Sequence, residues 1–209
     1  MTRAQQRAWQ NLWPRLGVEA TDSMLDLDAI FGRRVRRTVE IGFGNGEALV
    51  ALAASRPAED FLGIEVHRPG VGHLMLRCEE LAVANLRILS QDAIDVLEQR
   101  LTPACFDEVL LYFPDPWPKK RHHKRRIVQD GFVALIASRL RTGGVFRLAT
   151  DWQPYADWML ETLGRCPLLR NESPDGGWSA RPASRPPTRF ELRGQQLGHA
   201  VRDLAFRRT

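Results

Sequence analysis

The residue best placed for chemistry in this sequence is Asp115, a carboxylate with prolines on both sides in the segment FPDPWP from Phe113 to Pro118. Because each proline fixes its own φ and restricts the residue before it, we expect Phe113, Asp115 and Trp117 to be extended. A carboxylate presented rigidly at the end of a strand can stabilise positive charge on a bound molecule. The alternative is a rigid loop with an exposed carboxylate, which leaves three prolines around one charge unexplained.

A basic segment follows at residues 119–126, where six of eight residues are Lys or Arg and the other two are His122 and His123. A solvated run of charge is the usual explanation of such a segment. This one lies between an expected strand and an expected helix beside Asp115, so we favour contact with phosphates. Adjacent histidines do not share a helix face, so we expect no metal there. The residues of the expected patch are Lys119, Lys120, Arg121, His122, His123 and Lys124.

A glycine-rich turn, EIGFGNG from Glu40 to Gly46, lies between an expected strand and an expected helix. Gly42, Gly44 and Gly46 lack Cβ atoms, so the backbone can approach a ligand closely, although a plain tight turn is the alternative. A dinucleotide site would need glycine at position 47, which is Glu47. Glu40 would repel a dinucleotide's phosphates but could hold a cationic amino-acid moiety. A nicotinamide cofactor is therefore disfavoured.

Other acidic residues follow the expected strands. Glu65 ends the second strand, where a carboxylate can accept both hydroxyls of an adenosine ribose. Asp92, after the third, can contact an adenine edge or cap the next helix, and both roles remain open. Asp151 follows the fifth strand, and Glu191 on a late strand could reach the same cleft; each is ambiguous from the residues alone.

Strand and helix patterns alternate along the chain, which predicts a doubly wound α/β domain with parallel strands and helices on both faces. We expect one domain over 1–209, with a helical arm at 1–37, a core at 38–209 and a mobile loop at 173–187. A strand is expected at 189–192 and a turn-bearing stretch at 194–204. The other expected strands are 38–41, 61–66, 86–90, 108–113 and 145–149, and the expected helices are 46–55, 70–84, 94–99, 127–140 and 155–163.

The composition fits a protein of the reducing cytoplasm. The 209 residues are 44% apolar, enough for one core, and the net charge of +5 favours anionic partners. Three widely spaced cysteines indicate neither a disulfide framework nor a zinc site. The first ten residues lack the apolar segment of a secretory signal, and the longest apolar stretches are too short to span a membrane.

The pattern closely resembles the bacterial tRNA (guanine-N7)-methyltransferases. The segments that carry the resemblance are VEIGFGNGEAL from Val39, GIEVHRPGV from Gly63, LLYFPDPWPKKRHHKRR from Leu110, LATDW from Leu148 and TRFELRGQQLGHAVRDL from Thr188. The first is general to methyltransferases, whereas the third and fifth are specific to this family. The segment MTRAQQRAWQNLWPRLG is similar to the family's N-terminal arm.

The resemblance implies a Rossmann-like, seven-stranded class I methyltransferase that uses S-adenosylmethionine and acts on a guanine at variable-loop position 46 of tRNA. By matching position, Glu40, Glu65, Asp92 and Asp115, with the three glycines, would bind or border the methyl donor. Lys119, Asp151 and the run Thr188, Arg189, Phe190 and Glu191 would contact the substrate. No obligate protein partner is expected, and the chain would be a monomer or a homodimer.

Guanine N7 carries a lone pair and no proton, so its methylation needs no general base. We therefore expect Asp115 to orient the guanine and stabilise the cationic product, with the base stacked on Trp117 or Phe113 in a flipped-out pose. Two alternatives are a dinucleotide-dependent oxidoreductase, which Glu40 and Glu47 oppose, and a non-catalytic RNA-binding module on a methyltransferase fold.

Overall fold

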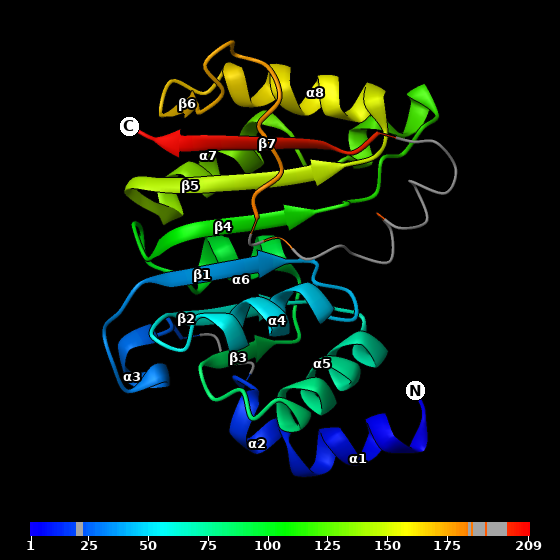
Figure 1. The fold of residues 1–209 in the computed structure, drawn as a ribbon, viewed down its shortest axis with the longest axis vertical. Coiled ribbons are helices and arrows are strands. Elements are labelled where there is room, and N and C mark those ends of the chain that lie inside the picture. The colour runs from blue at the N-terminus through cyan, green and yellow to red at the C-terminus, as the bar shows by residue number, and fades with distance from the viewer. Residues whose placement is uncertain (20–22, 184, 186–190, 192–199) are drawn as a thin grey trace.

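The computed structural model describes residues 1–19, 23–183, 185, 191 and 200–209, and its centre is a seven-stranded sheet (Figure 1). The strand order is β3-β2-β1-β4-β5-β7-β6. The first five strands in sequence pair in parallel, whereas β7 runs antiparallel to β5 and β6. The strands are β1 Arg37–Ile41, β2 Asp60–Ile64, β3 Leu86–Leu89, β4 Phe106–Tyr112, β5 Leu140–Thr150, β6 Leu169–Asn171 and β7 Arg202–Arg208. The expected doubly wound α/β fold is confirmed.

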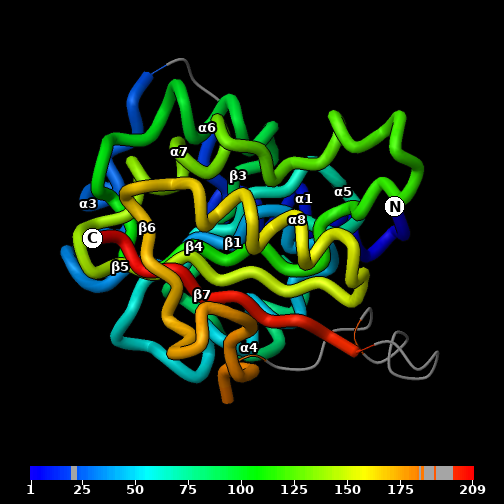
Figure 2. Tube along the Cα trace, turned by 90° about the horizontal axis from the view of Figure 1, so that it is seen from above, coloured from blue at the N-terminus to red at the C-terminus, as the bar shows by residue number. Residues whose placement is uncertain are grey.

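Helices cover both faces of this sheet, and Figure 2 shows α6, α7 and α8 on one side of the strands and α4 on the other. Each face has its own apolar core. One core joins α1, α2, α4 and α5 to the sheet, and the second joins α3, α6, α7 and α8 to the opposite face. The helices are α1 Arg3–Asn11, α2 Trp13–Leu16, α3 Leu27–Phe31, α4 Glu47–Ser55, α5 Arg68–Glu80, α6 Ala93–Gln99, α7 Asp130–Arg139 and α8 Gln153–Gly164, with a 3₁₀ helix, η1, at Lys120–Arg125.

The central strands are buried because helices cover both of their faces. All five residues of β1 are buried, with Val39 and Ile41 in one core. Between them, Glu40 points to the other face, because successive side chains of a strand alternate. A charged residue in such a strand is expensive unless it has a role or a partner. The position of Glu40 therefore singles it out before any ligand is considered.

The N-terminal residues form α1 and α2, which lie against α5. Thr2 and Gln5 make a reciprocal capping box at the start of α1. The side chain of Gln5 also donates to the Pro69 carbonyl at 3.1 Å, and the indole N–H of Trp9 donates to the Arg68 carbonyl at 3.2 Å. These bonds fix α1 beside the first turn of α5, next to the carboxyl ends of the strands.

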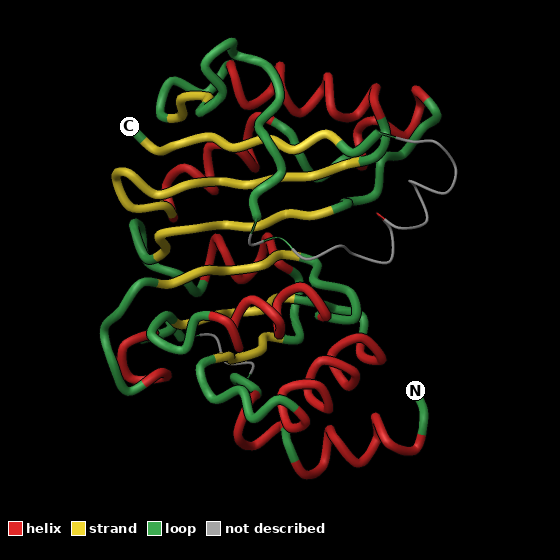
Figure 3. The backbone as a smooth tube through the Cα atoms, in the orientation of Figure 1, coloured by secondary structure: helices red, strands yellow, loops and turns green. Residues whose placement is uncertain are grey.

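Several elements differ from those expected from the sequence (Figure 3). The helix expected from residue 127 begins at Asp130, because residues 120–125 form η1 first. The short strand β6 was not expected, and β7 covers 202–208, where the end of a turn-bearing stretch was expected. The strand expected at 189–192 lies outside the described residues except for Glu191, which is helical, so the expectation is wrong at that residue.

After β6 the chain runs across one face of the sheet. In Figure 1 the described part of this segment (orange) runs in front of β7, β5 and β4, on the side of the sheet that α4 covers. The amide of Ser179 donates to the Asp203 carbonyl of β7 at 2.9 Å. The mobility expected for residues 173–187 stays a prediction.

Among the described helices, none has both the length and the apolar character needed to cross a membrane.

Candidate active site

A cleft of about 380 Å³ opens at the carboxyl ends of β1, β2 and β4. Ligands of doubly wound folds bind at this edge of the sheet, because the strand order reverses there and the crossovers leave a crevice. Residues that the sequence singled out line this cleft: Gly42, Glu65, Asp92, Phe113, Asp115 and Trp117.

The glycine-rich turn forms one wall of the site. Gly42, Gly44 and Gly46 have φ angles of +68°, +58° and +75°, which side chains rarely adopt. A Cβ on Gly42 or Gly44 would have no protein atom within 4 Å, so the backbone at these positions is open to a ligand. A Cβ on Gly46 would instead lie 2.5 Å from a methyl carbon of Leu74. Gly42 therefore lines the cleft, Gly44 is bonded to the cleft residue Glu65, and Gly46 serves packing against α5.

Glu65 fastens this turn to the end of β2. One carboxylate oxygen accepts the backbone N–H of Gly44 at 2.8 Å, and the other accepts that of His67 at 2.8 Å. Each carboxylate oxygen has a second lone pair, so Glu65 can still accept hydroxyl groups of a ribose in the cleft. The close approach continues at Gly70, where a Cβ would lie 2.0 Å from the Gly44 carbonyl oxygen.

Glu40 is buried, with only 4% of its surface exposed, and it lines a small cavity, separate from the cleft, that Arg56, Arg147 and Arg185 also line. Its Oε2 atom has no hydrogen-bond partner among the described residues. Burial, and then the charge of Glu65, raise the pKa of Glu40 to about 8. An unsatisfied buried carboxylate favours a cationic ligand, because the ligand's charge would stabilise the ionised form.

Asp92 caps α6. Its Oδ1 atom accepts the N–H of Ile94 at 2.8 Å and that of Asp95 at 3.4 Å. Of the two roles that the sequence left open, capping is therefore present. Since Asp92 also lines the cleft, contact with an adenine edge stays a prediction.

The loop that carries Asp115 has an unexpected backbone. Phe113 and Trp117 have φ angles of +52° and +43°, so the prediction that they are extended is wrong. Phe113 still donates its N–H to Ala149 at 2.8 Å, which continues the β4–β5 ladder, and the chain then has to turn sharply toward η1. Tertiary contacts override the local preference of residues before proline, at a cost of about 1–3 kcal/mol each. Asp115 itself is exposed at the edge of the cleft.

The basic segment divides into an exposed part and a buried anchor. Arg126 is only 3% exposed, with its guanidinium 4.8 Å from the ring centre of Tyr155 and 5.3 Å from that of Trp158. Its Nε donates to the Pro116 carbonyl at 2.9 Å, which fixes the loop beside Asp115. The exposed residues are Lys119, Lys120, Arg121, Lys124 and Arg125, and His122 and His123 are half-buried.

Trp117 connects the cleft to the basic segment. The guanidinium of Arg125 lies 5.0 Å from the Trp117 ring centre, and His122 meets the same ring edge-on at 5.8 Å. Trp117, one of the aromatic side chains that line the cleft, is therefore in contact with the segment expected to bind phosphates.

The substrate residues expected near the C-terminus are only partly described. Asp151 follows β5 and is half-buried, whereas Thr188, Arg189 and Phe190 lie outside the described residues. Glu191 is buried and accepts a hydrogen bond from Arg185 at 2.7 Å. Neither Arg185 nor Arg126 was singled out from the sequence as a buried residue. No local sequence signal predicts their burial, because each lies among charged and polar residues that are usually exposed.

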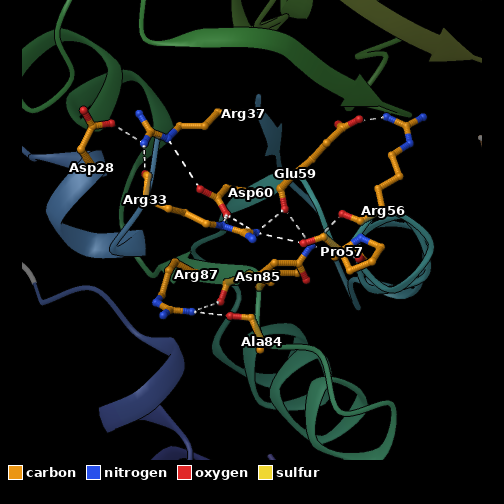
Figure 4. Close-up of polar contacts among 12 residues, drawn as sticks. Asp28, Arg33, Arg37, Arg56, Pro57, Glu59, Asp60, Ala84, Asn85 and Arg87 are labelled. Carbon is orange, nitrogen blue, oxygen red and sulfur yellow. Dashed lines mark hydrogen bonds and ion pairs between the residues drawn. The ribbon is translucent and has the colours of Figure 1, made fainter. Parts of the chain in front are cut away.

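Two other cavities, of about 360 and 450 Å³, lie at the opposite edge of the sheet. A polar cluster beside them is drawn in Figure 4, where Arg33 and Arg37 converge on Asp60 at the start of β2. The Nε of Arg33 donates to Asp60 at 2.8 Å, and Arg37 also pairs with Asp28. These contacts tie α3 to the sheet. The amino ends of parallel strands are not where such folds bind ligands, so we assign the site to the glycine-lined cleft.

The site suits S-adenosylmethionine. Gly42 and Gly44 leave room for close approach, and Glu65 can accept ribose hydroxyls. The unsatisfied oxygen of Glu40 belongs to a residue that lines a separate small cavity, so contact between Glu40 and the donor stays a prediction. Among the residues that the structure describes, no group of three His, Cys, Asp or Glu side chains could hold a metal ion.

A doubly wound, seven-stranded sheet with this glycine turn and these carboxylates defines a class I methyltransferase that uses S-adenosylmethionine. The family model described as "Putative methyltransferase" matches residues 35–204. The chain is 52% identical over 209 residues to the tRNA (guanine-N(7)-)-methyltransferase of Methylococcus capsulatus, covering 100% of this chain and 90% of that protein. It is 50% identical over 208 residues to the protein of the same name from Pseudomonas aeruginosa, covering 100% of this chain and 85% of the relative.

The chain therefore belongs to the tRNA (guanine-N7)-methyltransferase family, and the resemblance seen in the sequence is confirmed. Among solved structures, the 16S rRNA methyltransferase KamB aligns with a TM-score of 0.62 at 13% identity, covering 93% of this chain and 99% of that chain. At this identity the likeness shows a shared fold.

Proposed function

We propose that this chain transfers the methyl group of S-adenosylmethionine to N7 of guanine at variable-loop position 46 of tRNA, giving 7-methylguanosine. The reaction class and the tRNA substrate follow from the family to which the chain belongs. One observation supports the residue roles: Asp115 is exposed at the rim of the donor cleft, and the basic segment begins four residues later. This arrangement fits a nucleic-acid base that lies against Asp115 beside the donor, with the phosphates of its chain on the basic segment outside the cleft.

The donor would be held by the carboxyl ends of β1 and β2. Glu65 would accept the ribose hydroxyls, Gly42 and Gly44 would let the backbone approach, and Glu40 would face the cationic part of the molecule. S-adenosylmethionine, when bound, supplies an activated methyl group on a sulfonium. The cationic part that Glu40 would hold is the ammonium group of the donor's amino-acid moiety.

Asp115 would act on the base and not on a proton. Guanine N7 is a nucleophile without deprotonation, and positive charge develops on the purine as it is methylated. A fixed carboxylate near the base stabilises that charge, and by accepting the guanine N–H donors it also orients N7. Trp117, held between Arg125 and His122, is a ready surface for stacking a flipped-out base.

The exposed cations of the basic segment would bind the tRNA backbone. The exposed cations beside the loop that carries Asp115 are Lys119, Lys120, Arg121 and Lys124. The buried Arg126 anchors their segment by its hydrogen bond to the Pro116 carbonyl. Contacts to phosphate position a nucleic acid without reading its sequence. Asp151 and the run from Thr188 to Glu191 would complete the substrate site. We further propose that the chain acts in the cytoplasm as a monomer or homodimer without an obligate protein partner.

The test is nucleoside analysis by mass spectrometry of an unmodified tRNA transcript incubated with the protein and S-adenosylmethionine. We expect one 7-methylguanosine per tRNA, lost when position 46 of the transcript is changed from guanine to adenine. Methylation of another base or position would contradict the proposal. A protein that binds tRNA but not the donor in calorimetric titration would instead be a non-catalytic RNA-binding module.

A further inference from the structure

We propose that Arg185 is a positioning residue for methyl transfer, which fixes the loop carrying Asp115 relative to the C-terminal part of the chain. This inference rests on the proposed function. Arg185 does not line the donor cleft, and it would act through Phe113 and Glu191.

The guanidinium of Arg185 is the centre of a buried ionic cluster. Its side chain has 0% of its surface exposed. It makes a two-pronged contact with Asp203 of β7, through Nε at 2.9 Å and Nη2 at 3.0 Å. Its Nη1 atom donates to Glu191 at 2.7 Å. One cation thus joins two carboxylates from separate parts of the C-terminal region.

The same guanidinium also lies over two aromatic rings at the end of β4. Its central carbon is 5.6 Å from the ring centre of Tyr112 and 5.7 Å from that of Phe113. Phe113 lines the donor cleft, has a φ of +52°, and precedes Asp115 by two residues. A strained backbone persists only where its surroundings hold it, and the guanidinium of Arg185 lies over the ring of this strained residue.

Stability alone is a poor reason for such a cluster. Removing three charges from water is costly, and buried ionic groups are often replaceable by apolar residues without loss of stability. A planar guanidinium, however, can make a two-pronged contact and cover aromatic rings together, which a lysine cannot do. The geometry therefore points to placement of the Asp115 loop as the role of Arg185.

The experiment compares the wild type with Arg185→Lys. This change keeps the positive charge but removes the two-pronged contact with Asp203 and the planar group over the aromatic rings. The matched control is Arg207→Lys, which lies on the same strand as Asp203 but pairs with Glu172 and the Gly143 carbonyl at the other edge of the sheet. Steady-state methylation of the tRNA transcript gives kcat and the KM for each substrate. We expect Arg185→Lys to lower kcat about 30-fold with both KM values within about threefold, because misplacement affects the transition state more than binding.

A merely structural role would lower the melting temperature and leave kcat per folded molecule unchanged. An Arg185→Lys protein with kcat within about twofold of the wild type therefore overturns the inference. If that variant does not fold, Asp203→Asn, which preserves the shape of the partner, takes its place with the same two outcomes. The wild-type assay separates the failures: an inactive wild type refutes the proposed function and this inference together, whereas an active wild type with an equally active variant refutes only this inference.

Discussion

The carboxylate of Glu65 accepts the backbone N–H of Gly44 at 2.8 Å, across 21 residues of sequence. The contact joins the carboxyl ends of β1 and β2, and it shapes the glycine turn before any ligand is bound. A carboxylate that a sequence motif assigns to the donor ribose therefore also supports the protein's own backbone. Both roles predict effects that can be measured separately.

Replacing Glu65 with Gln should weaken donor binding. The amide keeps one acceptor oxygen but turns an NH₂ group toward the N–H of Gly44 or His67. A lost charge-assisted hydrogen bond is worth about 1.5–3 kcal/mol, so we expect the Kd for S-adenosylmethionine to rise about ten- to hundredfold. Calorimetric titration measures this, with Glu80→Gln on the exposed side of α5 as control. An unchanged Kd would show that Glu65 does not support the donor site.

Gly70→Ala should destabilise the protein, whereas Gly131→Ala should not. The new Cβ at 70 would lie 2.0 Å from the Gly44 carbonyl oxygen, so the glycine turn or α5 has to move. We expect a loss of about 1–3 kcal/mol in the free energy of unfolding, together with weaker donor binding. Gly131, in α7, has no atom within 4 Å of an added Cβ, and its replacement should gain up to about 1 kcal/mol. Urea unfolding measures the free energy of unfolding of both variants. Equal changes in the two variants would argue against tight contact between Gly70 and the glycine turn.

Glu40 should make the stability of the donor-free protein depend on pH. Its folded pKa is about 8, above the ordinary value of 4.5, so between these values the folded state holds a proton that the unfolded state has lost. The stabilising contribution is present below pH 4.5 and is lost as the pH rises toward 8. Glu40→Gln should remove this loss, so the melting temperature of the variant relative to the wild type should increase with pH over that range.

Calorimetric melting at several pH values measures this difference, with Glu79→Gln at an exposed position of α5 as control. A difference between Glu40→Gln and the wild type that stays constant with pH would mean that Glu40 is ionised in the folded protein. Titration of the donor in buffers of different ionisation enthalpy gives a second readout. Proton release on binding is expected for the wild type at neutral pH and not for the Gln variant.

Asp115→Asn should lower kcat by the same factor at every pH. Removing one group that stabilises transition-state charge typically costs about 10²–10³ in kcat. N7 needs no base, so the ratio of wild-type to variant rates should be flat with pH. A ratio that follows the titration of one acid would instead identify Asp115 as a general base. Donor Kd values, measured in parallel, separate the effect on chemistry from an effect on binding.

The basic segment should divide functionally as it does structurally. Replacing the exposed Lys119, Lys120, Arg121 and Lys124 with Gln should weaken tRNA binding and reduce its dependence on salt concentration, since each phosphate contact adds about 0.7–0.9 to the logarithmic slope. Donor binding should be unaffected. A variant with the wild-type salt slope would refute the assignment of these residues to the tRNA backbone.

Arg126→Met is the contrasting variant. Arg126 is buried, donates to Pro116 and lies over Tyr155 and Trp158, so its loss should lower the free energy of unfolding by about 1–3 kcal/mol. The salt slope of tRNA binding should stay as in the wild type while the loop is folded. Chemical unfolding and salt titration of the same preparation distinguish these effects.

Much of the fold and the position of the cleft follow from the local sequence. The alternation of apolar strands with helices, and the glycines after the first strand, give the parallel core, because crossover helices have to cover both faces of the sheet. The same topology brings Glu65, Asp92 and Asp115 to one edge, since the carboxyl ends of parallel strands meet there. The cleft and its carboxylates were therefore predictable without any tertiary contact.

Only the tertiary structure decided which cations are inside. Arg126 and Arg185 belong to runs that read as exposed, yet each is buried by rings and carboxylates distant in the sequence. The positive φ angles of Phe113 and Trp117 contradict the local preference before proline, because the end of β4 has to turn toward η1. The antiparallel β6–β7 edge likewise rests on pairing between distant segments. Local sequence sets the period and the turn residues, whereas non-local packing fixes burial, strained backbone and the partner of each charge.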